Sequence, residues 1–363
     1  MEIVNDYGDW LAEYAALRQS AGILDLSVRS RICLTGADRV RFLHGQVTND
    51  VKKLRVGEGC YAALVTAKGK MESDLNIFCL ADELLLDFEP DLTKRVSQRL
   101  EKFIVADDVQ VVDVAPHYGL LSVQGPKAGE LVQALGWGEC PHGPFDSIKI
   151  ADAALGEIYL ANHLRLLFVC SSGRESAHNQ SRLTSAATDK TIFGFDLFVP
   201  NSSLAAVKDK LIAAAKQIGG RLCGWQAFET VRIEAGIPRF GMDMDETNIP
   251  LECGIESSAV SYNKGCYFGQ EVINRIHSIG HVNKELRGLL LADDLQSLPK
   301  KGDKLFRDGK EVGYITSSAK SPVAGNIALG YVRREANHIG IELILRTTSD
   351  ENSAKIVELP FVR

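Results

Sequence analysis

A cysteine in a glycine-bracketed loop has the strongest case for chemistry in this sequence. Cys266 stands in the run NKGCYFGQE over residues 263–271, between Gly265 and Gly269. Glycine lets the chain bend tightly around a ligand, and the positive charge of Lys264 would favour a thiolate at the nearby sulfur. The sequence therefore predicts a reactive or ligand-contacting thiol. The alternative is an ordinary turn that holds a partly buried cysteine.

A pair of opposite charges near the end of an expected helix is a second candidate. Arg232 and Glu234 lie two residues apart and so do not share a helix face. We expect one of the two side chains to point inward. Gly236 and Pro238 are ordinary helix stop signals, so the alternative is a capped helix whose charges are solvated.

A third candidate is the polar stretch Lys68–Asp74, together with the earlier Thr-Asn-Asp at 48–50. Asp74 begins an expected strand, from which its carboxylate could face a pocket. The alternative is a hairpin with polar residues on its solvated side. The Gly-Lys pair at 69–70 is no phosphate-binding loop, because the required upstream glycine and the following Ser or Thr are missing.

Metal and nucleophile motifs are weakly represented. His277 and His281 have the spacing of two ligands on one helix face. Gly280 between them argues against a stable helix and no third ligand is evident, so we predict no metal site. The sequence also lacks the GxSxG and GxGxxG patterns.

Hydrophobic periodicity indicates the elements that position these candidates. Residues 236–280 are rich in glycine and polar side chains and show little periodicity, and loops of such length are often functional. The expected helices cover about 10–17, 40–43, 92–103, 126–135, 204–216 and 225–235. The expected strands cover about 30–34, 60–65, 74–80, 84–88, 119–123, 166–169 and 193–199, with others near 148 and 158.

From Glu285 onward, short strands alternate with turns and suggest a small β-barrel or sandwich. These strands are expected at 286–291, 304–306, 311–316, 327–332 and 341–345. The fold class is therefore α+β. We expect two regions, an α+β region over 1–282 and a terminal β domain over 283–363.

The composition is that of a globular cytoplasmic protein. Of 363 residues, 45% are hydrophobic, and the net charge of −6 gives no support for nucleic-acid binding. No run approaches the roughly 20 apolar residues of a membrane helix, and the acidic start is unlike a secretory signal. Eight cysteines without a CxxC pair suggest small buried hydrophobes in a reducing compartment, apart from Cys266.

The segment KGCYFGQE over 264–271 resembles the K-G-C-[FY]-x-G-Q-E signature of YgfZ-type folate-binding proteins. These belong to the aminomethyltransferase (glycine cleavage T protein) superfamily. Landmarks of that superfamily occur along nearly the whole chain, at 20–27, 48–50, 124–126, 232–236 and 330–332. The resemblance implies three subdomains arranged like a cloverleaf around a central channel, with a C-terminal β-barrel and tetrahydrofolate in the channel.

The chain departs from the transferase pattern at two positions. Ser73 stands where Gly-Gly-x-x-Asp-Asp has its first Asp, and serine cannot carry the charge that would steady a cationic amine, although Asp74 could partly substitute. Phe228 aligns with a pterin-contacting Arg. The resemblance implies cofactor contacts from Asp74, Asp196, Phe228, Arg232, Glu234, Tyr267, Gln270 and Glu271, with Cys266 and Lys264 in the catalytic roles.

The leading interpretation is an auxiliary protein that binds tetrahydrofolate and supports iron–sulfur cluster assembly or repair. Cys266 would act as a thiolate toward a transferred group or cluster, and iron–sulfur assembly proteins would be its partners. The alternative is a folate-dependent aminomethyltransferase or demethylase, and a third is a non-catalytic folate carrier. The residues leave open whether the chain is an enzyme.

Overall fold

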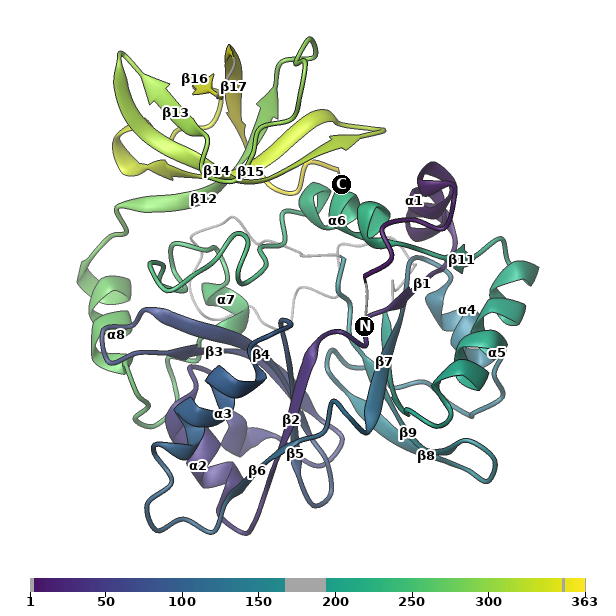
Figure 1. Cartoon of the computed structure of the whole chain (residues 1–363). Coiled ribbons are helices and arrows are strands. Elements are labelled where there is room, and N and C mark those ends of the chain that lie inside the picture. Colours follow the sequence, from purple (N-terminus) through teal and green to yellow (C-terminus); the bar gives the residue numbers. More distant parts are fainter. Residues whose placement is uncertain (1–2, 167–193, 348–349, 363) are drawn as a thin grey trace.

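The computed structural model describes residues 3–166, 194–347 and 350–362. In these residues two β-sheets and a closed β-barrel surround a common centre (Figure 1). The barrel lies at the top of the view, the five-stranded sheet at the lower left and the six-stranded sheet at the lower right. This arrangement confirms the predicted α+β class with a C-terminal barrel.

The five-stranded sheet is antiparallel, with the strand order β3-β4-β5-β2-β6. Its apolar face packs against α2 and α3 in one core cluster. Side chains alternate between the two faces of a strand, so the other face of the sheet looks toward the centre of the molecule. The bounds are β2 (Ser30–Thr35), α2 (Arg39–Gln46), η1 (Val51–Lys53), β3 (Gly59–Val65), β4 (Met71–Cys79), β5 (Leu84–Phe88), α3 (Thr93–Glu101) and β6 (Gln110–Asp113).

The six-stranded sheet has the order β11-β1-β7-β10-β9-β8. Helices α4 and α5 cover its outer face, while its inner face meets the five-stranded sheet in a shared cluster that includes Phe78 and Phe198. The bounds are β1 (Gly22–Asp25), β7 (Tyr118–Gln124), α4 (Ala128–Gln133), β8 (Ser147–Asp152), β9 (Gly156–Asn162), β10 (Phe195–Pro200), α5 (Leu204–Gln217) and β11 (Arg221–Leu222).

The barrel closes in the order β12-β15-β14-β13-β16-β17. Helix α6 (Trp225–Glu234) lies between it and α1 (Trp10–Gln19), and contacts both α1 and β14. One apolar cluster joins β3, β4, α6 and the barrel, so the five-stranded sheet and α6 pack against the barrel. The bounds are β12 (Lys284–Leu291), β13 (Lys304–Arg307), β14 (Lys310–Ser321), β15 (Gly325–Arg333), η2 (Arg334–Ala336), β16 (Glu342–Arg346) and β17 (Glu351–Val357).

Most expected elements are present, with differences at particular places. The segment expected to be a long loop, 236–280, contains α7 (Glu256–Ala259) and α8 (Gln270–Ile279). Asp74 lies inside β4 rather than at its start. The short strands β1 and β6 and the barrel-closing β17 were not predicted, and nearly all of the strand expected at 166–169 lies outside the described residues.

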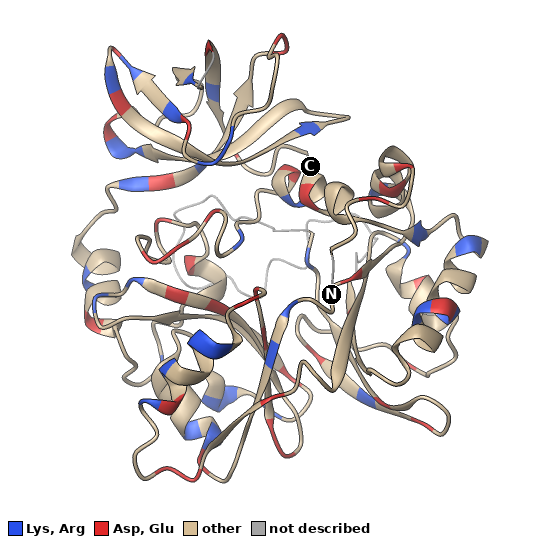
Figure 2. Ribbon diagram, viewed as in Figure 1, with Lys and Arg blue, Asp and Glu red and all other residues tan. Residues whose placement is uncertain are grey.

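Charged side chains of both signs are interspersed over the two sheets and the barrel (Figure 2). Within the described part of the chain, no helix has the length and apolar character needed to cross a membrane. Of the seven cysteines described, only Cys266 is exposed, a property on which the sequence made no prediction. Cys170 lies outside the described residues.

Candidate functional site

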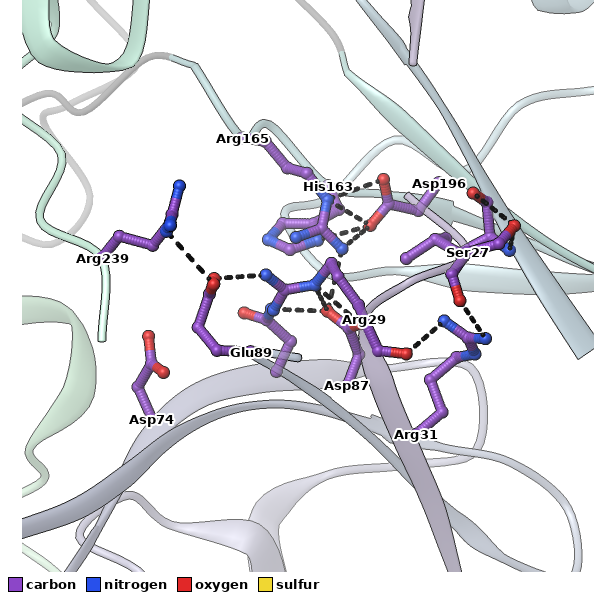
Figure 3. Close-up of polar contacts among 12 residues, drawn as sticks. Ser27, Arg29, Arg31, Asp74, Asp87, Glu89, His163, Arg165, Asp196 and Arg239 are labelled. Carbon is purple, nitrogen blue, oxygen red and sulfur yellow. Dashed lines mark hydrogen bonds and ion pairs between the residues drawn. The ribbon is translucent and has the colours of Figure 1, made fainter. Parts of the chain in front are cut away.

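A cluster of charged side chains fills the centre between the two sheets (Figure 3). Strand register explains which residues of the five-stranded sheet point into this cluster, because residues directly opposite each other in an antiparallel pair lie on the same face. Asn76 stands opposite both Tyr61 and Asp87, which places these three on the central face. We call the following set the central polar cluster: Arg29, Asp74, Asp87, Glu89, His163, Arg165, Asp196 and Arg239.

Asp87 is the anion that holds the two sheets together at this centre. The residue is fully buried. Its Oδ1 lies 2.9 Å from Nε of Arg29, which immediately precedes β2 of the same sheet, and its Oδ2 lies 2.9 Å from Nη2 of Arg165, which follows β9 of the six-stranded sheet. Burial opposes ionisation of Asp87, but the two guanidinium charges outweigh it and hold the pKa of this carboxyl well below its usual range. Asp87 is therefore a permanent anion with its partners in place.

Asp74 lies on the same face but in the opposite electrostatic situation. Its Oδ2 accepts a hydrogen bond from the Tyr61 hydroxyl at 2.9 Å, and its Oδ1 is buried with no hydrogen-bond partner in the described residues. Burial and the negative charge of Glu89 outweigh the attraction of Arg29 and raise the pKa of Asp74 to about 6. Asp74 can thus exchange a proton near neutral pH, and one of its oxygens is free to accept a donor.

Ser73 faces away from this centre. It stands opposite Leu64 and two residues before Leu75, and both of these leucines belong to the core on the helix-covered side of the sheet. Its buried hydroxyl donates to the backbone carbonyl of Asp74. The side chain at position 73 therefore contributes no charge to the central face. The carboxylate that this part of β4 presents there is that of Asp74.

Asp196 is the counterpart of Asp87 on the six-stranded sheet. Its carboxylate is fully buried and accepts hydrogen bonds from His163 Nδ1 at 2.7 Å and from Arg165 at 2.6 Å. Burial opposes ionisation, but Arg165 and His163 together lower its pKa. Both oxygens have protein partners. Asp196 therefore fixes Arg165 between the sheets, a role that the sequence interpretation, which gave it a cofactor contact, did not include.

Phe228 is buried in α6 and packs on Trp225, with ring centroids 5.3 Å apart. The guanidinium of Arg239 lies 4.7 Å from the centre of the Trp225 ring and pairs with Glu89 at 3.2 Å and with Glu229 at 2.6 Å. A cation thus reaches this region from the loop after α6, although position 228 carries an apolar ring. Sequence reasoning missed Arg239, and an arginine just beyond a helix stop was the only signal for it.

Arg232 and Glu234 are both buried, which corrects the expectation that only one would point inward. Arg232 pairs with Asp243 at 2.8 Å and donates to Ser317 of the barrel, while Glu234 accepts hydrogen bonds from Tyr14 of α1 and from the barrel. The physical reason is that α6 is covered on two sides. These residues fasten α6 to its neighbours.

Lys264 has a different role from the predicted one. It is 8% exposed, and its ammonium group donates to the carbonyl oxygens of His44, Val47 and Asn49 at 2.6, 2.7 and 2.8 Å. Burial lowers its pKa to about 8. The charge that sequence reasoning assigned to the Cys266 thiol is therefore used to hold the loop against the segment 44–49.

The rest of the KGCYFGQE loop is partly exposed. Tyr267 is buried against the cluster that includes β3 and β4, and its hydroxyl has no hydrogen-bond partner in the described residues. Gln270 is half-buried and Glu271 exposed, both in the first turn of α8. Asp74 and Asp196 thus share the central polar cluster, whereas the described hydrogen bonds of Lys264 attach this loop to α2 and the residues after it.

The two histidines considered as metal ligands do not form a pair on one helix. His277 stacks on Tyr262 and contacts Glu256 through Nδ1 at 2.6 Å, while His281 lies beyond the end of α8. Within residues 3–166, 194–347 and 350–362, no three His, Cys, Asp or Glu side chains are grouped so that they could hold a metal ion.

Comparison with known proteins shows to which family this architecture belongs. Residues 1–186 and 192–264 match the family model of the GCVT N-terminal domain, and residues 284–363 match that of the glycine cleavage T-protein C-terminal barrel domain. The chain belongs to the glycine cleavage T-protein family. The superfamily indicated by the sequence resemblance is thereby confirmed.

Individual members of the family are similar over nearly their whole length. An aminomethyltransferase of Halalkalibacterium halodurans is 28% identical, with 99% of this chain and 94% of that protein covered. An aminomethyltransferase of Bacillus subtilis is 26% identical over the same shares. The crystal structure of the aminomethyltransferase T from Bartonella henselae matches with a TM-score of 0.82 at 21% identity, over 99% of this chain and 91% of that chain. That structural likeness concerns the fold.

Proposed function

We propose that this chain binds tetrahydrofolate at the central polar cluster, with Asp74 as its main polar contact. The observation that supports this most directly is the Asp74 Oδ1 atom, which is buried and unpaired within the described residues. A buried acceptor without a partner costs about 1–3 kcal/mol. The N–H groups of a reduced pterin ring are donors that would remove this cost, so the residues present fit the cofactor.

Tetrahydrofolate, when bound, supplies the ring and linker nitrogens that carry a one-carbon group. Asp74 can hold or release a proton beside such a nitrogen, because its pKa of about 6 lies close to the working pH. Tyr61 orients the carboxylate through its hydroxyl, and Glu89 and Arg29 set its charge. Arg165 pairs with both Asp87 of the five-stranded sheet and Asp196 of the six-stranded sheet, and so links the two sheets within the central polar cluster.

Calorimetric titration with tetrahydrofolate tests this proposal. We expect saturable binding to the wild type and a loss of about 10- to 100-fold in affinity for Asp74→Asn, since a hydrogen bond to a charged group contributes about 1.5–3 kcal/mol. The matched control is Ser73→Ala on the opposite face of the same strand, which should bind like the wild type. Absence of binding by the wild type, or equal affinity of Asp74→Asn, would overturn the proposal.

Aminomethyl transfer is one proposed use of the bound folate. The relatives from H. halodurans and B. subtilis carry the name aminomethyltransferase, which supports this candidate. The orientation of Ser73 supports it too, because the missing carboxylate at that position would not have faced the centre. Arg239 brings a cation to the region where position 228 has none.

A YgfZ-type role in iron–sulfur cluster assembly or repair is the second proposed use. It is favoured by Cys266, which is the exposed cysteine among those described. Its loop is attached by buried Lys264 to the end of α2 and the residue that follows that helix. A thiol presented in this way would meet a partner or substrate at the surface, which the aminomethyl chemistry at Asp74 does not require.

The two uses predict different outcomes in cells. A strain that lacks the protein would be complemented with the wild type, Asp74→Asn or Cys266→Ser, and both glycine cleavage and the activity of iron–sulfur enzymes would be measured. Loss of glycine cleavage with Asp74→Asn, and full function of Cys266→Ser, supports aminomethyl transfer. Loss of iron–sulfur enzyme activity with Cys266→Ser, and intact glycine cleavage, supports the second use.

A further inference from the structure

A cavity of about 220 Å³ lies between the N-terminal segment, the end of β1 and the beginning of α6. Three polar side chains, those of Tyr7, Asp25 and Lys208, line it, and none of them has a part in the proposed function. We call this space the N-terminal cavity. Its larger apolar side chains are those of Ile3, Val4, Leu24, Leu26, Val28 and Trp225. A dry cavity of about 150 Å³ holds a benzene molecule, so this larger space suits a ligand of roughly nine non-hydrogen atoms.

The N-terminal wall of this cavity is fixed by hydrogen bonds to the main chain. The Trp225 amide donates to the Val4 carbonyl at 2.9 Å, so that the first residues run alongside the start of α6 (Figure 1). Buried Glu13 accepts from the Tyr7 amide at 2.6 Å and from the Gly224 amide at 2.8 Å. The cavity is therefore preformed, and a ligand that enters it does not have to order this wall.

An ion pair supplies the polar side of the N-terminal cavity. Lys208 Nζ, from α5, lies 3.0 Å from Oδ2 of Asp25, the last residue of β1, and the two side chains are 26% and 19% exposed. Asp25 Oδ1 also accepts the Ser27 amide at 3.2 Å. In the described part of the chain Lys208 donates no other hydrogen bond, although an ammonium group has about three donors and a carboxylate about four acceptor sites. Both charges therefore have capacity for a ligand.

The Tyr7 side chain lies close to both of these charges. Burial raises the pKa of its hydroxyl, Lys208 opposes this rise and Asp25 adds to it. The polar groups of the cavity thus gather around one anion and one cation, whereas most of the remaining lining is apolar.

The two opposite charges determine which ligand matches the cavity. A ligand with a single charge meets one attractive and one repulsive partner, because Asp25 and Lys208 are only 3.0 Å apart. A zwitterion can place an ammonium group against Asp25 and a carboxylate against Lys208 at the same time. Such contacts are stronger beside apolar walls than in bulk water. The matching ligand therefore carries both charges at one end and an apolar group at the other.

We propose that the N-terminal cavity binds a free α-amino acid with an apolar side chain of about the size of that of leucine. Its ammonium group pairs with Asp25, its carboxylate pairs with Lys208, and its side chain occupies the apolar part of the cavity. The residues that carry this site lie outside the central polar cluster, so the site goes beyond the proposed function and does not depend on folate binding.

Calorimetric titration of the full wild-type chain with L-leucine and three analogues is the first test. Isopentylamine lacks the carboxylate, 4-methylpentanoate lacks the ammonium group, and glycine lacks the side chain. We expect saturable binding of L-leucine and about 10- to 100-fold weaker binding of the amine and of the acid, since each loses a hydrogen bond between charged groups. Glycine should bind more than about 100-fold more weakly, because each of the four missing carbon atoms contributes about fourfold.

Variants of the ion pair should change the preference among these ligands. Asp25→Asn should bind L-leucine about tenfold more weakly but 4-methylpentanoate more tightly than the wild type, because the acid no longer meets an anion. Lys208→Met should show the same reversal for isopentylamine. The matched control Lys210→Met removes an exposed lysine from the same helix and should bind all four ligands like the wild type.

The wild-type titrations alone can overturn the proposal, whatever the variants do to the fold. Absence of saturable L-leucine binding, or equal affinity for L-leucine and the two singly charged analogues, would do so. An equal loss for all ligands in both variants would also overturn it, because the ion pair would then only maintain the shape of the cavity. Binding of L-leucine without binding of tetrahydrofolate would refute the proposed function and leave this site standing.

Discussion

Replacement of Asp74 by asparagine should stabilise the protein at neutral pH. Burial and the charge of Glu89 raise the pKa of Asp74 from 3.8 to about 6. As the pH rises from about 4 to about 6, the unfolded chain releases this proton before the folded chain does, so the free energy of unfolding falls. This pKa difference corresponds to about 3 kcal/mol in total. Asparagine carries no charge and still accepts the Tyr61 hydroxyl, so the variant avoids this loss.

Urea unfolding at pH 4 and pH 8, followed by circular dichroism, measures the effect. The stability of Asp74→Asn relative to the wild type should increase by about 2 kcal/mol between these pH values, since part of the wild-type loss has already occurred at pH 4. A relative stability that is independent of pH, or a variant less stable than the wild type at pH 8, would refute the assignment of Asp74 to an unpaired buried site.

Asp87→Asn is the matched comparison, because it changes the same residue type on the same sheet face. The Asp87 pKa is lowered rather than raised, so this carboxylate contributes stability above its unfolded pKa, and that contribution is lost only as the pH falls. Its removal leaves Arg29 and Arg165 buried with one anion fewer, at a cost of about 3–5 kcal/mol at pH 7. Opposite signs for the two variants would establish that pairing, and not burial alone, separates them.

Three further outcomes follow from the packing. Arg165→Met should lower the free energy of unfolding by about 3–5 kcal/mol in urea titrations, because Asp87 and Asp196 lose their shared cation; a loss under about 1 kcal/mol would contradict this. Lys264→Met should cost about 3 kcal/mol in the same assay, because three carbonyl oxygens lose a charged donor; wild-type stability would contradict it. A protease site inserted between Gly280 and His281, two residues before the proposed domain boundary, should give two fragments that co-elute in gel filtration after cleavage, because α6 and the barrel share an apolar cluster; separate elution without denaturant would contradict it.

The sequence predicted elements well where the information was local. The strand 84–88 and the helix beginning at Leu204 have the predicted positions, because their periodicity and flanking turns act over a few residues. The barrel was indicated by short strands at regular intervals. Its closure depends on β17, which pairs with both β12 and β16, and that pairing is not visible in one segment.

The candidate site was predicted in part. Asp74 and Cys266 stood out by residue type and neighbours, and the structure places Asp74 in the central polar cluster and Cys266 on the surface. The assignments that changed were those of charged residues. Arg232, Glu234 and Lys264 are buried, and each has partners from distant parts of the chain. Arg29, Arg165 and Arg239 have no motif around them and were not predicted.

The sequence by itself determined the fold class, most of the longer helices and strands, the superfamily and the two residues on which the proposed function depends. Tertiary structure decided the charge state and partners of each polar group. The physical reason is that periodicity reports which face of an element is apolar, whereas the pKa of a carboxyl depends on charges brought within a few ångströms by strand register and sheet packing. Asp74 and Asp87 are both aspartates within predicted strands. Burial and the position of Glu89 raise the pKa of Asp74 to about 6, whereas the positions of Arg29 and Arg165 outweigh burial and keep that of Asp87 well below its usual range.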